Sequence, residues 1–304
     1  MRIVTQITDL RRIIRKMKRA GKTIGLVPTM GALHEGHLWL IRRARRENDF
    51  IVVSIFVNPT QFNRSDDFRR YPRTLRADAR LAQGAGADLV FPPSAVSMYP
   101  AGFQTHVEVE HLSRTLEGKL RPGHYRGVAT VVAKLFHLVQ PNTAYFGQKD
   151  AQQAALIRRL IQDLNFDVRL KILPTVREAD GLAMSSRNRL LSSEARRSSR
   201  VLFLALQQGR RLIESGERRR ALVERRIRSA VRKIRSAKID YVAIVDPETF
   251  ERTPEIRGKV LALLAVWIGP VRLIDEMSIN VRGSPPEADP PLAGTRSART
   301  NRSP

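Results

Sequence analysis

The chain has 304 residues and no cysteine, and 54 lysines and arginines against 29 acidic residues give it a formal net charge of +25. The length allows two domains with cores of their own, and the lack of cysteine excludes disulfides and thiolate metal sites, which fits a reducing cytoplasm. There is no apolar stretch near 18 residues and no signal-peptide pattern, so we expect a cytoplasmic protein without membrane spans.

The positive charge invites a comparison with nucleic-acid-binding proteins. The basic residues are spread along predicted helix faces, as in residues 42–46 and 218–235, and no zinc-finger, homeodomain or RNP signature accompanies them. We therefore interpret the charge as a solvated, arginine-biased surface with no specific nucleic-acid partner. An RNA-binding role without catalysis is an alternative that rests on charge alone.

An early segment of the chain predicts a β-loop-α-β unit. Residues 23–27 form a short apolar run typical of a strand, and Pro28 is expected to end it because a central strand cannot continue through proline. A loop over residues 29–34 leads into an amphipathic helix over residues 35–48. The nearly continuous apolar run 50–57 indicates a strand buried on both faces, so the unit implies a parallel sheet.

Strands and helices alternate on either side of this unit. Helices are predicted over residues 7–20, 75–84, 127–139 and 151–164, and strands over residues 88–91, 106–109, 143–146 and 168–173. This alternation favours an α/β fold with a Rossmann-like, doubly wound parallel sheet.

The pattern changes after residue 176. Residues 177–188 are polar and loop-like, and Ser192 is the expected N-cap of a helix over residues 193–215. A basic helix over residues 218–236 and three β-rich runs follow, and we expect these runs to form a small antiparallel sheet. The runs are residues 239–245, 260–268 and 271–277.

These elements predict three parts of the chain. Residues 1–175 form the Rossmann-like domain that binds the substrates, and residues 176–282 form a smaller C-terminal α+β lid domain. Residues 283–304 contain almost nothing that could fill a core, so we expect a disordered tail.

The start of the helix at residue 35 carries the first chemical signal, the motif His34-Glu-Gly-His37. A helix N-terminus offers unpaired backbone N–H groups and partial positive charge, so it suits an anion. Residues three apart share a helix face, which lets His34 and His37 approach one phosphate chain, and Gly36 permits close backbone approach. The motif alone also fits two solvated histidines or half of a metal site.

Two further loops follow predicted strands, where open α/β sheets bind ligands. The first is Asn58-Pro-Thr-Gln-Phe62. The second is Gly147-Gln-Lys-Asp150, in which Lys149 could neutralise phosphate oxygens and Asp150 could accept hydrogen bonds from ribose hydroxyls.

Six motifs in chain order closely resemble the pantothenate synthetase family, and the resemblance covers about residues 3–280. They are Pro28-Thr-Met-Gly-Ala-Leu-His-Glu-Gly-His37, Phe56-Val-Asn-Pro-Thr-Gln-Phe62, Tyr71-Pro-Arg-Thr74, Arg121-Pro-Gly-His124, Ala144-Tyr-Phe-Gly-Gln-Lys-Asp150 and Met184-Ser-Ser-Arg-Asn188. The resemblance implies an AMP-forming ligase that joins pantoate to β-alanine with ATP through pantoyl adenylate. It also implies Mg²⁺ beside the triphosphate, held without a dedicated protein metal site, and a homodimer.

The resemblance also implies roles for individual residues. His37 is the proton donor, and His34 and Lys149 are the other catalytic residues. The pantoate and β-alanine site contains Gln61 and Gln153, with Asn58 as a lesser ligand. The implied ATP-binding residues are Met30, Gly31, Ala32, Leu33, His34, Glu35, Gly36, His37, Gly147, Gln148, Lys149, Asp150, Val176, Met184, Ser185, Ser186 and Arg187.

The chain departs from the family pattern at Trp39, His137 and Glu276, none of which replaces a named ligand. Trp39 is expected to point away from the histidines, because it lies on another helix face. Another nucleotidyltransferase of the same superfamily is the main alternative, since such an enzyme would keep the two histidines and the Met184 loop without the paired Gln61 and Gln153.

Overall fold

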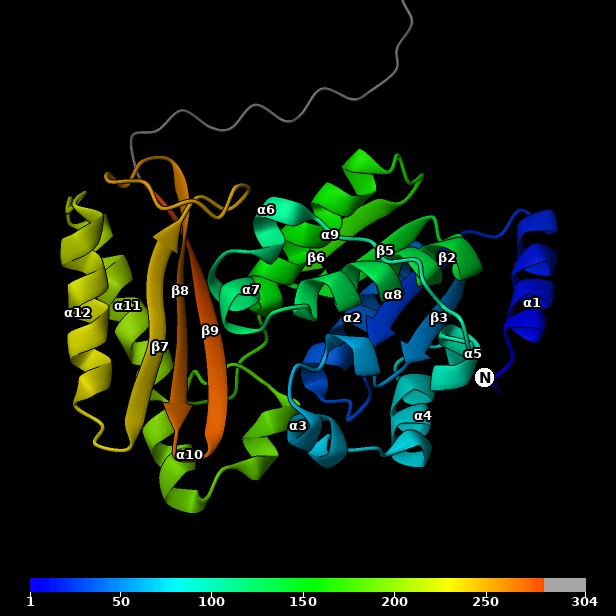
Figure 1. Cartoon of the computed structure of the whole chain (residues 1–304), viewed down its shortest axis with the longest axis horizontal. Helices are drawn as coiled ribbons and strands as arrows, with labels where there is room; N and C mark the ends of the chain where they lie inside the picture. Colours follow the sequence, from blue (N-terminus) through cyan, green and yellow to red (C-terminus); the bar gives the residue numbers. More distant parts are fainter. Residues whose placement is uncertain (282–304) are drawn as a thin grey trace, which may run out of the picture.

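A computed structural model of the chain describes residues 1–281, and the predicted tail 283–304 lies outside the described residues. The main sheet has six parallel strands in the order β1-β4-β3-β2-β5-β6. Figure 1 shows its strands β2, β3, β5 and β6 beside the helices of this half. The strands are β1 Arg2–Ile3, β2 Ile24–Thr29, β3 Phe50–Ile55, β4 Leu89–Phe91, β5 Thr143–Gly147 and β6 Arg169–Leu173. The predicted doubly wound parallel sheet is confirmed: five of the six strands predicted in this half are present, and the short edge strand β1 is an addition.

The order of the strands fixes where a ligand can bind. The chain proceeds from β2 to β3 and β4 on one side and continues with β5 and β6 on the other. The connections that follow β2 and β5 therefore diverge, which leaves a crevice beyond the carboxyl ends of these two strands.

Helices cover both faces of this sheet, because side chains of one strand alternate between two apolar clusters. Leu26 and Val52 belong to the cluster that includes α8, whereas Val27 and Val53 belong to the cluster that includes α2. The helices in this half are α1 Ile7–Arg19, α2 Glu35–Glu47, α3 Ser65–Arg70, α4 Leu75–Gly84, α5 Ala95–Met98, α6 Glu110–Ser113, α7 Leu116–Leu120, α8 His124–Val139 and α9 Ala151–Asp163.

The expectation that Pro28 ends its strand is wrong, because β2 continues to Thr29. The backbone N–H of Asn142, next to β5, donates to the carbonyl of Ile24, so the even-numbered residues of β2 direct their backbone groups toward β5. The ladder between β2 and β5 ends at Leu26. Pro28 lacks the N–H that would point toward β5, but β5 no longer pairs with β2 at this point, so no hydrogen bond is lost. The ladder with β3 is unaffected.

The strand predicted over residues 106–109 is absent from the structure. Instead of pairing with a strand, the N–H of Val107 donates to the hydroxyl of Thr130 on α8 at 3.0 Å. A side chain of a helix thus satisfies a backbone group that a neighbouring strand would otherwise bind.

The C-terminal half contains the predicted antiparallel sheet, in the order β7-β8-β9. Ser192 caps a helix as expected, its side chain accepting the N–H of Ala195 at 3.2 Å. The predicted helix 193–215 is divided at Arg200 into two helices. The elements are α10 Ser193–Ser199, α11 Val201–Glu214, α12 Arg220–Arg232, β7 Ala237–Val245, β8 Lys259–Ile268 and β9 Val271–Asn280.

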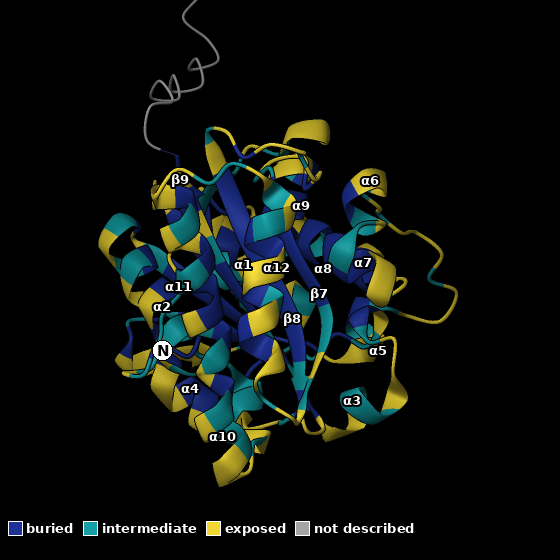
Figure 2. Cartoon of the chain, turned by 90° about the vertical axis from the view of Figure 1, so that its left-hand side faces the viewer, coloured by how far each residue is buried: buried dark blue, intermediate teal, exposed yellow. Residues whose placement is uncertain are grey.

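Both faces of the second sheet are buried (Figure 2). Along β7, Val242 and Ile244 face the cluster formed with α11 and α12, whereas Tyr241 and Ala243 face the large cluster of the first sheet. The two sheets therefore share an apolar core, and the domain boundary near residue 175 stays a prediction. No helix within residues 1–281 is long and apolar enough to cross a membrane.

Candidate active site

The loop after β2 places two imidazoles at the N-terminus of α2. His34 is the N-cap residue, and its Nδ1 accepts the backbone N–H of Gly36 at 3.2 Å. The backbone N–H of His34 in turn donates to Nδ1 of His37 at 3.3 Å, and the two ring centroids are 4.1 Å apart. Because each Nδ1 accepts a hydrogen bond, the proton of each neutral ring is on Nε2. Both Nε2–H groups are then free to donate to a ligand.

Burial keeps both imidazoles neutral. Burial, with electrostatic interactions with His37 and Lys149 as further causes, lowers the pKa of His34 to about 3. Burial also lowers the pKa of His37 to about 4, despite the nearby carboxylate of Asp150. At neutral pH these side chains are therefore hydrogen-bond donors without charge, and Lys149 is a cation that lines the same cavity.

Asp78, which no motif in the sequence marks, fixes the shape of this loop. Its buried carboxylate accepts the backbone N–H groups of Ala32 and Leu33 at 3.0 and 2.8 Å, and Thr74 donates to it at 3.1 Å. Gly31 has a φ of +83°, and a Cβ there would lie 3.0 Å from the Asp78 carboxylate. Gly31, Ala32 and Leu33 thus fix the conformation of the loop through their contacts with Asp78.

The residues after β3 form a buried amide pair, in which Asn58 is the N-cap and Gln61 the last residue of the short helix η1 Pro59–Gln61. The side-chain N–H₂ of Asn58 donates to Oε1 of Gln61 at 3.0 Å and to the carbonyl of Gly127 at 3.1 Å. The Asn58 oxygen accepts from the hydroxyls of Thr60 and Tyr99 at 2.9 and 2.8 Å. All four hydrogen-bonding positions of Asn58 are therefore used inside the protein.

Gln61 keeps a donor directed at the crevice. Its Nε2 lies 3.1 Å from the Met30 sulfur, which is a weak acceptor. Its backbone carbonyl accepts from Nδ1 of buried His124 at 2.7 Å, and Nε2 of that ring then accepts from Arg121 at 3.2 Å. Burial, followed by the charge of Arg121, lowers the pKa of His124 to about 4. The motif Arg121-Pro-Gly-His124 therefore holds Gln61 in place.

The loop after β5 completes the opposite wall. Nζ of Lys149 lies 3.8 Å from the Asp150 carboxylate. Burial acts to raise the pKa of Asp150, but the positive charges of Lys149 and Arg187 outweigh burial and keep that pKa below its usual value. The carboxylate is therefore ionised at neutral pH and available as an acceptor.

Most of the predicted site residues line one cavity of about 220 Å³. These residues are Met30, His34, Gly36, His37, Gln61, Gly147, Lys149, Asp150, Gln153, Val176, Met184, Ser185, Ser186 and Arg187. The predicted residues that do not line it are Gly31, Ala32, Leu33, Glu35, Asn58 and Gln148. Trp39 is 36 % exposed and also lies outside the cavity, as expected.

The segment around Met184 joins the two halves of the molecule over this cavity. The N–H of Met184 donates to the carbonyl of Val176 at 3.0 Å, and Arg187 forms an ion pair of 3.1 Å with Asp67 on α3. Behind the segment, Arg177 donates to both carboxylate oxygens of buried Asp275 at 2.8 and 2.9 Å. The segment is thus anchored to β9 on one side and tethered to α3 on the other.

The donor groups of the cavity do not form a metal site of their own. Within residues 1–281 no group of three or more histidine and acidic side chains is placed to hold a metal ion. Mg²⁺ that accompanies a nucleotide is held mainly by phosphate oxygens and water and needs no such group.

Comparison with known proteins identifies the family. The model of the family described as Pantoate-beta-alanine ligase matches residues 2–278. Pantothenate synthetase from Moorella thermoacetica is 52 % identical over 281 residues, which cover 92 % of this chain and 99 % of the relative. The crystal structure of pantothenate synthetase from Thermus thermophilus has 47 % identity and a TM-score of 0.87, covering 91 % of this chain and 99 % of that chain.

A further relative was solved with ligands. Pantoate-beta-alanine ligase from Francisella tularensis, complexed with beta-gamma ATP and β-alanine, has 36 % identity and a TM-score of 0.76, covering 91 % of this chain and 97 % of that chain. The matches include both sheets and every loop that lines the cavity, so this chain is a member of the pantoate-β-alanine ligase family.

Proposed function

We propose that the chain joins pantoate to β-alanine at the expense of ATP, releasing pantothenate, AMP and pyrophosphate. The observation that carries this proposal is the arrangement of one cavity: the imidazoles of His34 and His37 with Lys149 at one end, and the amides of Gln61 and Gln153 beside them. The first set suits phosphate groups and the second suits a hydroxy acid.

In the first step, a pantoate carboxylate oxygen attacks the α-phosphorus of ATP. The bond to the bridging oxygen of the β-phosphate breaks, and its electron pair leaves with pyrophosphate. Negative charge grows on phosphate oxygens beside the N-terminus of α2, where the Nε2–H groups of His34 and His37 donate and Lys149 supplies the positive charge. Because the donors are already oriented, little reorganisation is needed when the charge develops.

In the second step, the amine of β-alanine attacks the acyl carbon of pantoyl adenylate. The bond from this carbon to the phosphate oxygen breaks, AMP leaves with the electron pair, and the amine nitrogen releases its proton. We assign the holding of pantoate to Gln61 and Gln153, which keeps the acyl carbon in place for both steps.

We assign Asn58 to positioning rather than to direct contact with substrate. Its amide is 1 % exposed and all its hydrogen bonds are internal, one of them to Oε1 of Gln61. This bond fixes which face of the Gln61 amide is directed at pantoate, so that Nε2 is the donor offered to the ligand.

Three further assignments belong to the same proposal. Mg²⁺ is taken as the companion of ATP, and no step is assigned to it. Val176 and Met184 through Arg187 are assigned to the adenine end and the phosphates, because these residues line the same cavity as His34 and His37. The homodimer and the cytoplasmic location expected from the sequence remain predictions.

Exchange of radioactive pyrophosphate into ATP tests the proposed function. The purified enzyme should catalyse this exchange only when pantoate is present, because the first step must be reversible on the enzyme before β-alanine arrives. Exchange without pantoate, or with another acid in its place, would assign the chain to a different nucleotidyltransferase activity.

A further inference from the structure

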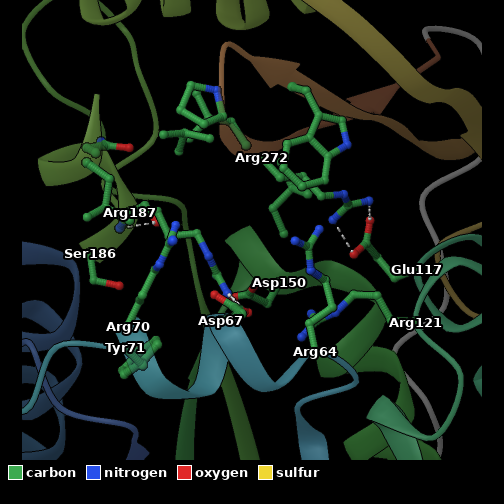
Figure 3. Close-up of a pocket in the computed structure, with 18 of the residues that line it drawn as sticks. Arg64, Asp67, Arg70, Tyr71, Glu117, Arg121, Asp150, Ser186, Arg187 and Arg272 are labelled. Carbon is green, nitrogen blue, oxygen red and sulfur yellow. Dashed lines mark hydrogen bonds and ion pairs between the residues drawn. The ribbon is translucent and has the colours of Figure 1, made fainter. Parts of the chain in front are cut away.

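A second, larger cavity of about 620 Å³ adjoins the one described above (Figure 3). It lies between α3, the Ser185–Arg187 segment and β9, and it shares Lys149, Asp150 and Arg121 with the first cavity. We call it the arginine chamber, because five arginines line it. They are Arg64, Arg70, Arg121, Arg187 and Arg272.

The acidic residues that line the chamber all have a basic partner. Asp66 pairs with Arg64 at 2.9 Å and Asp67 with Arg187 at 3.1 Å. Glu117 and Asp240 both pair with Arg272, at 2.8 and 2.7 Å, and Asp150 lies 3.8 Å from Lys149. Of the five arginines, Arg64, Arg187 and Arg272 are thus paired with carboxylates. Arg70 and Arg121 have no acidic partner in the described part of the chain.

These two guanidinium groups differ in their surroundings. Arg70 is exposed on α3, and none of its side-chain N–H groups has a hydrogen-bond acceptor within residues 1–281. Arg121 is half-buried, and among residues 1–281 its side chain donates only to the neutral ring of His124. Burial, and next the positive charge of Arg187, lower the pKa of Arg121. An anion in the chamber would supply acceptors to these groups and offset the repulsion between Arg121 and Arg187.

We propose that the arginine chamber is a binding site for a diphosphate group, with Arg70 and Arg121 as its principal cationic ligands. Three observations lead to this chemistry. The chamber opens directly from Lys149 and Arg187 of the first cavity, its free donors are guanidinium forks that match phosphate oxygens, and its volume accommodates an inorganic diphosphate with water.

Two sources can supply such a group, and this step rests on the proposed function. One is the pyrophosphate that leaves the α-phosphorus in the first half-reaction, which would move from the histidines into the chamber on its way out. The other is the β,γ-diphosphate of ATP before it settles against His34 and His37. Both present the same oxygens to Arg70, so the experiment has to separate them.

Calorimetric titration of the full-length enzyme with inorganic pyrophosphate tests the site without turnover. Arg70→Ala should weaken pyrophosphate binding about tenfold, since it removes a charge-assisted donor, and Arg70→Glu should weaken it further. Arg69→Ala is the matched control, because Arg69 is equally exposed on the same short helix but does not line the chamber. The control should bind pyrophosphate as the parent does, and Arg70→Lys should fall between the parent and Arg70→Ala.

A parallel titration with a non-hydrolysable ATP analogue separates the two sources. Loss of affinity for pyrophosphate alone assigns the chamber to the leaving group, and an equal loss for the analogue assigns it to the incoming nucleotide. Unchanged pyrophosphate affinity in both Arg70→Ala and Arg70→Glu would overturn the proposal. Because the readout is binding, it stays separate from the exchange assay: a failed exchange with intact, Arg70-dependent binding would reject the proposed function and leave the chamber as a diphosphate site.

Discussion

The hydroxyl of Thr175 donates to Oε1 of Glu276 at 2.5 Å, while Oε2 of the same carboxyl is buried and has no hydrogen-bond partner within residues 1–281. Burial raises the pKa of Glu276 to about 7, the Thr175 hydrogen bond opposes this shift, and the neighbouring Asp275 adds to it. A carboxyl group close to the proposed adenine-binding wall thus exchanges its proton near neutral pH.

Glu276→Gln should change how stability depends on pH. The folded parent retains a proton that the unfolded chain loses between the ordinary pKa of 4.5 and about 7, so the parent loses stability as pH rises through this window. Glutamine cannot ionise, so the variant should gain stability relative to the parent over the same window, by about 3 kcal/mol at most.

Urea unfolding of both proteins at pH 5 and pH 8 measures this difference. The gap in unfolding free energy between variant and parent should be larger at pH 8. Glu108→Gln, at an exposed position without partners in the described residues, should follow the parent at both values. A gap that does not depend on pH would show that Glu276 is ionised throughout.

His37→Ala should affect the two half-reactions unequally. Adenylation builds charge beside the N-terminus of α2, and loss of one oriented donor there typically costs about 10²–10³ in rate. Amide formation places its charge on the acyl oxygen, so conversion of supplied pantoyl adenylate should fall less than the complete reaction.

Both assays should be run on purified parent and variant with saturating β-alanine. His111→Ala is the control, because that imidazole is exposed and does not line the cavity. Equal losses in the two assays would mean that His37 holds the AMP moiety in both steps rather than acting as a donor in adenylation.

Gln61→Ala should weaken pantoate binding far more than ATP binding. The amide of Gln61 is 7 % exposed, and a buried hydrogen-bond partner left unpaired costs about 1–3 kcal/mol, roughly ten- to hundredfold in affinity. Separate titrations with pantoate and with a non-hydrolysable ATP analogue would measure the two effects. Comparable losses for both ligands would remove Gln61 from the pantoate site.

Asp78→Ala should destabilise the fold and weaken ATP binding together. It leaves the buried N–H groups of Ala32 and Leu33 without acceptors, at about 1–3 kcal/mol each. Asp78→Asn keeps one acceptor oxygen and should lie between the parent and the alanine variant. Thermal unfolding and nucleotide titration would check both effects, and an alanine variant of unchanged stability would show that the loop does not depend on this carboxylate.

The sequence was sufficient to predict the alternating strands and helices, because a strand buried on both faces and an amphipathic helix have distinct apolar periods. The prediction that Pro28 ends its strand was wrong, because the sequence does not reveal toward which neighbouring strand each backbone group points. The prediction was also wrong at residues 106–109, where Val107 has the apolar pattern of a strand but bonds to the hydroxyl of Thr130.

In the candidate site, too, some residues could be predicted from the sequence and others could not. Residues in local motifs, such as His34 and His37, were found because their spacing places them on one helix end. Asp78 was missed, because it acts on a loop more than 40 residues earlier in the chain and no local pattern marks it. Asn58 was selected as a lesser ligand, yet its internal hydrogen bonds become visible only when η1, α8 and the Tyr99 hydroxyl are brought together.

The apolar core shared by the two sheets limits how the crevice can open. Tyr241 and Leu263 of the second sheet belong to the same apolar cluster as Leu112 and Leu156 of the first half. Moving the second sheet away from the first half as a unit would therefore expose a large apolar surface to water. We therefore expect substrates and products to pass by the outer segments, α3 and the turn η3 Ser186–Leu190, which the Arg187–Asp67 ion pair holds together. The two halves of the enzyme should therefore stay packed together, and opening should be confined to this small outer contact.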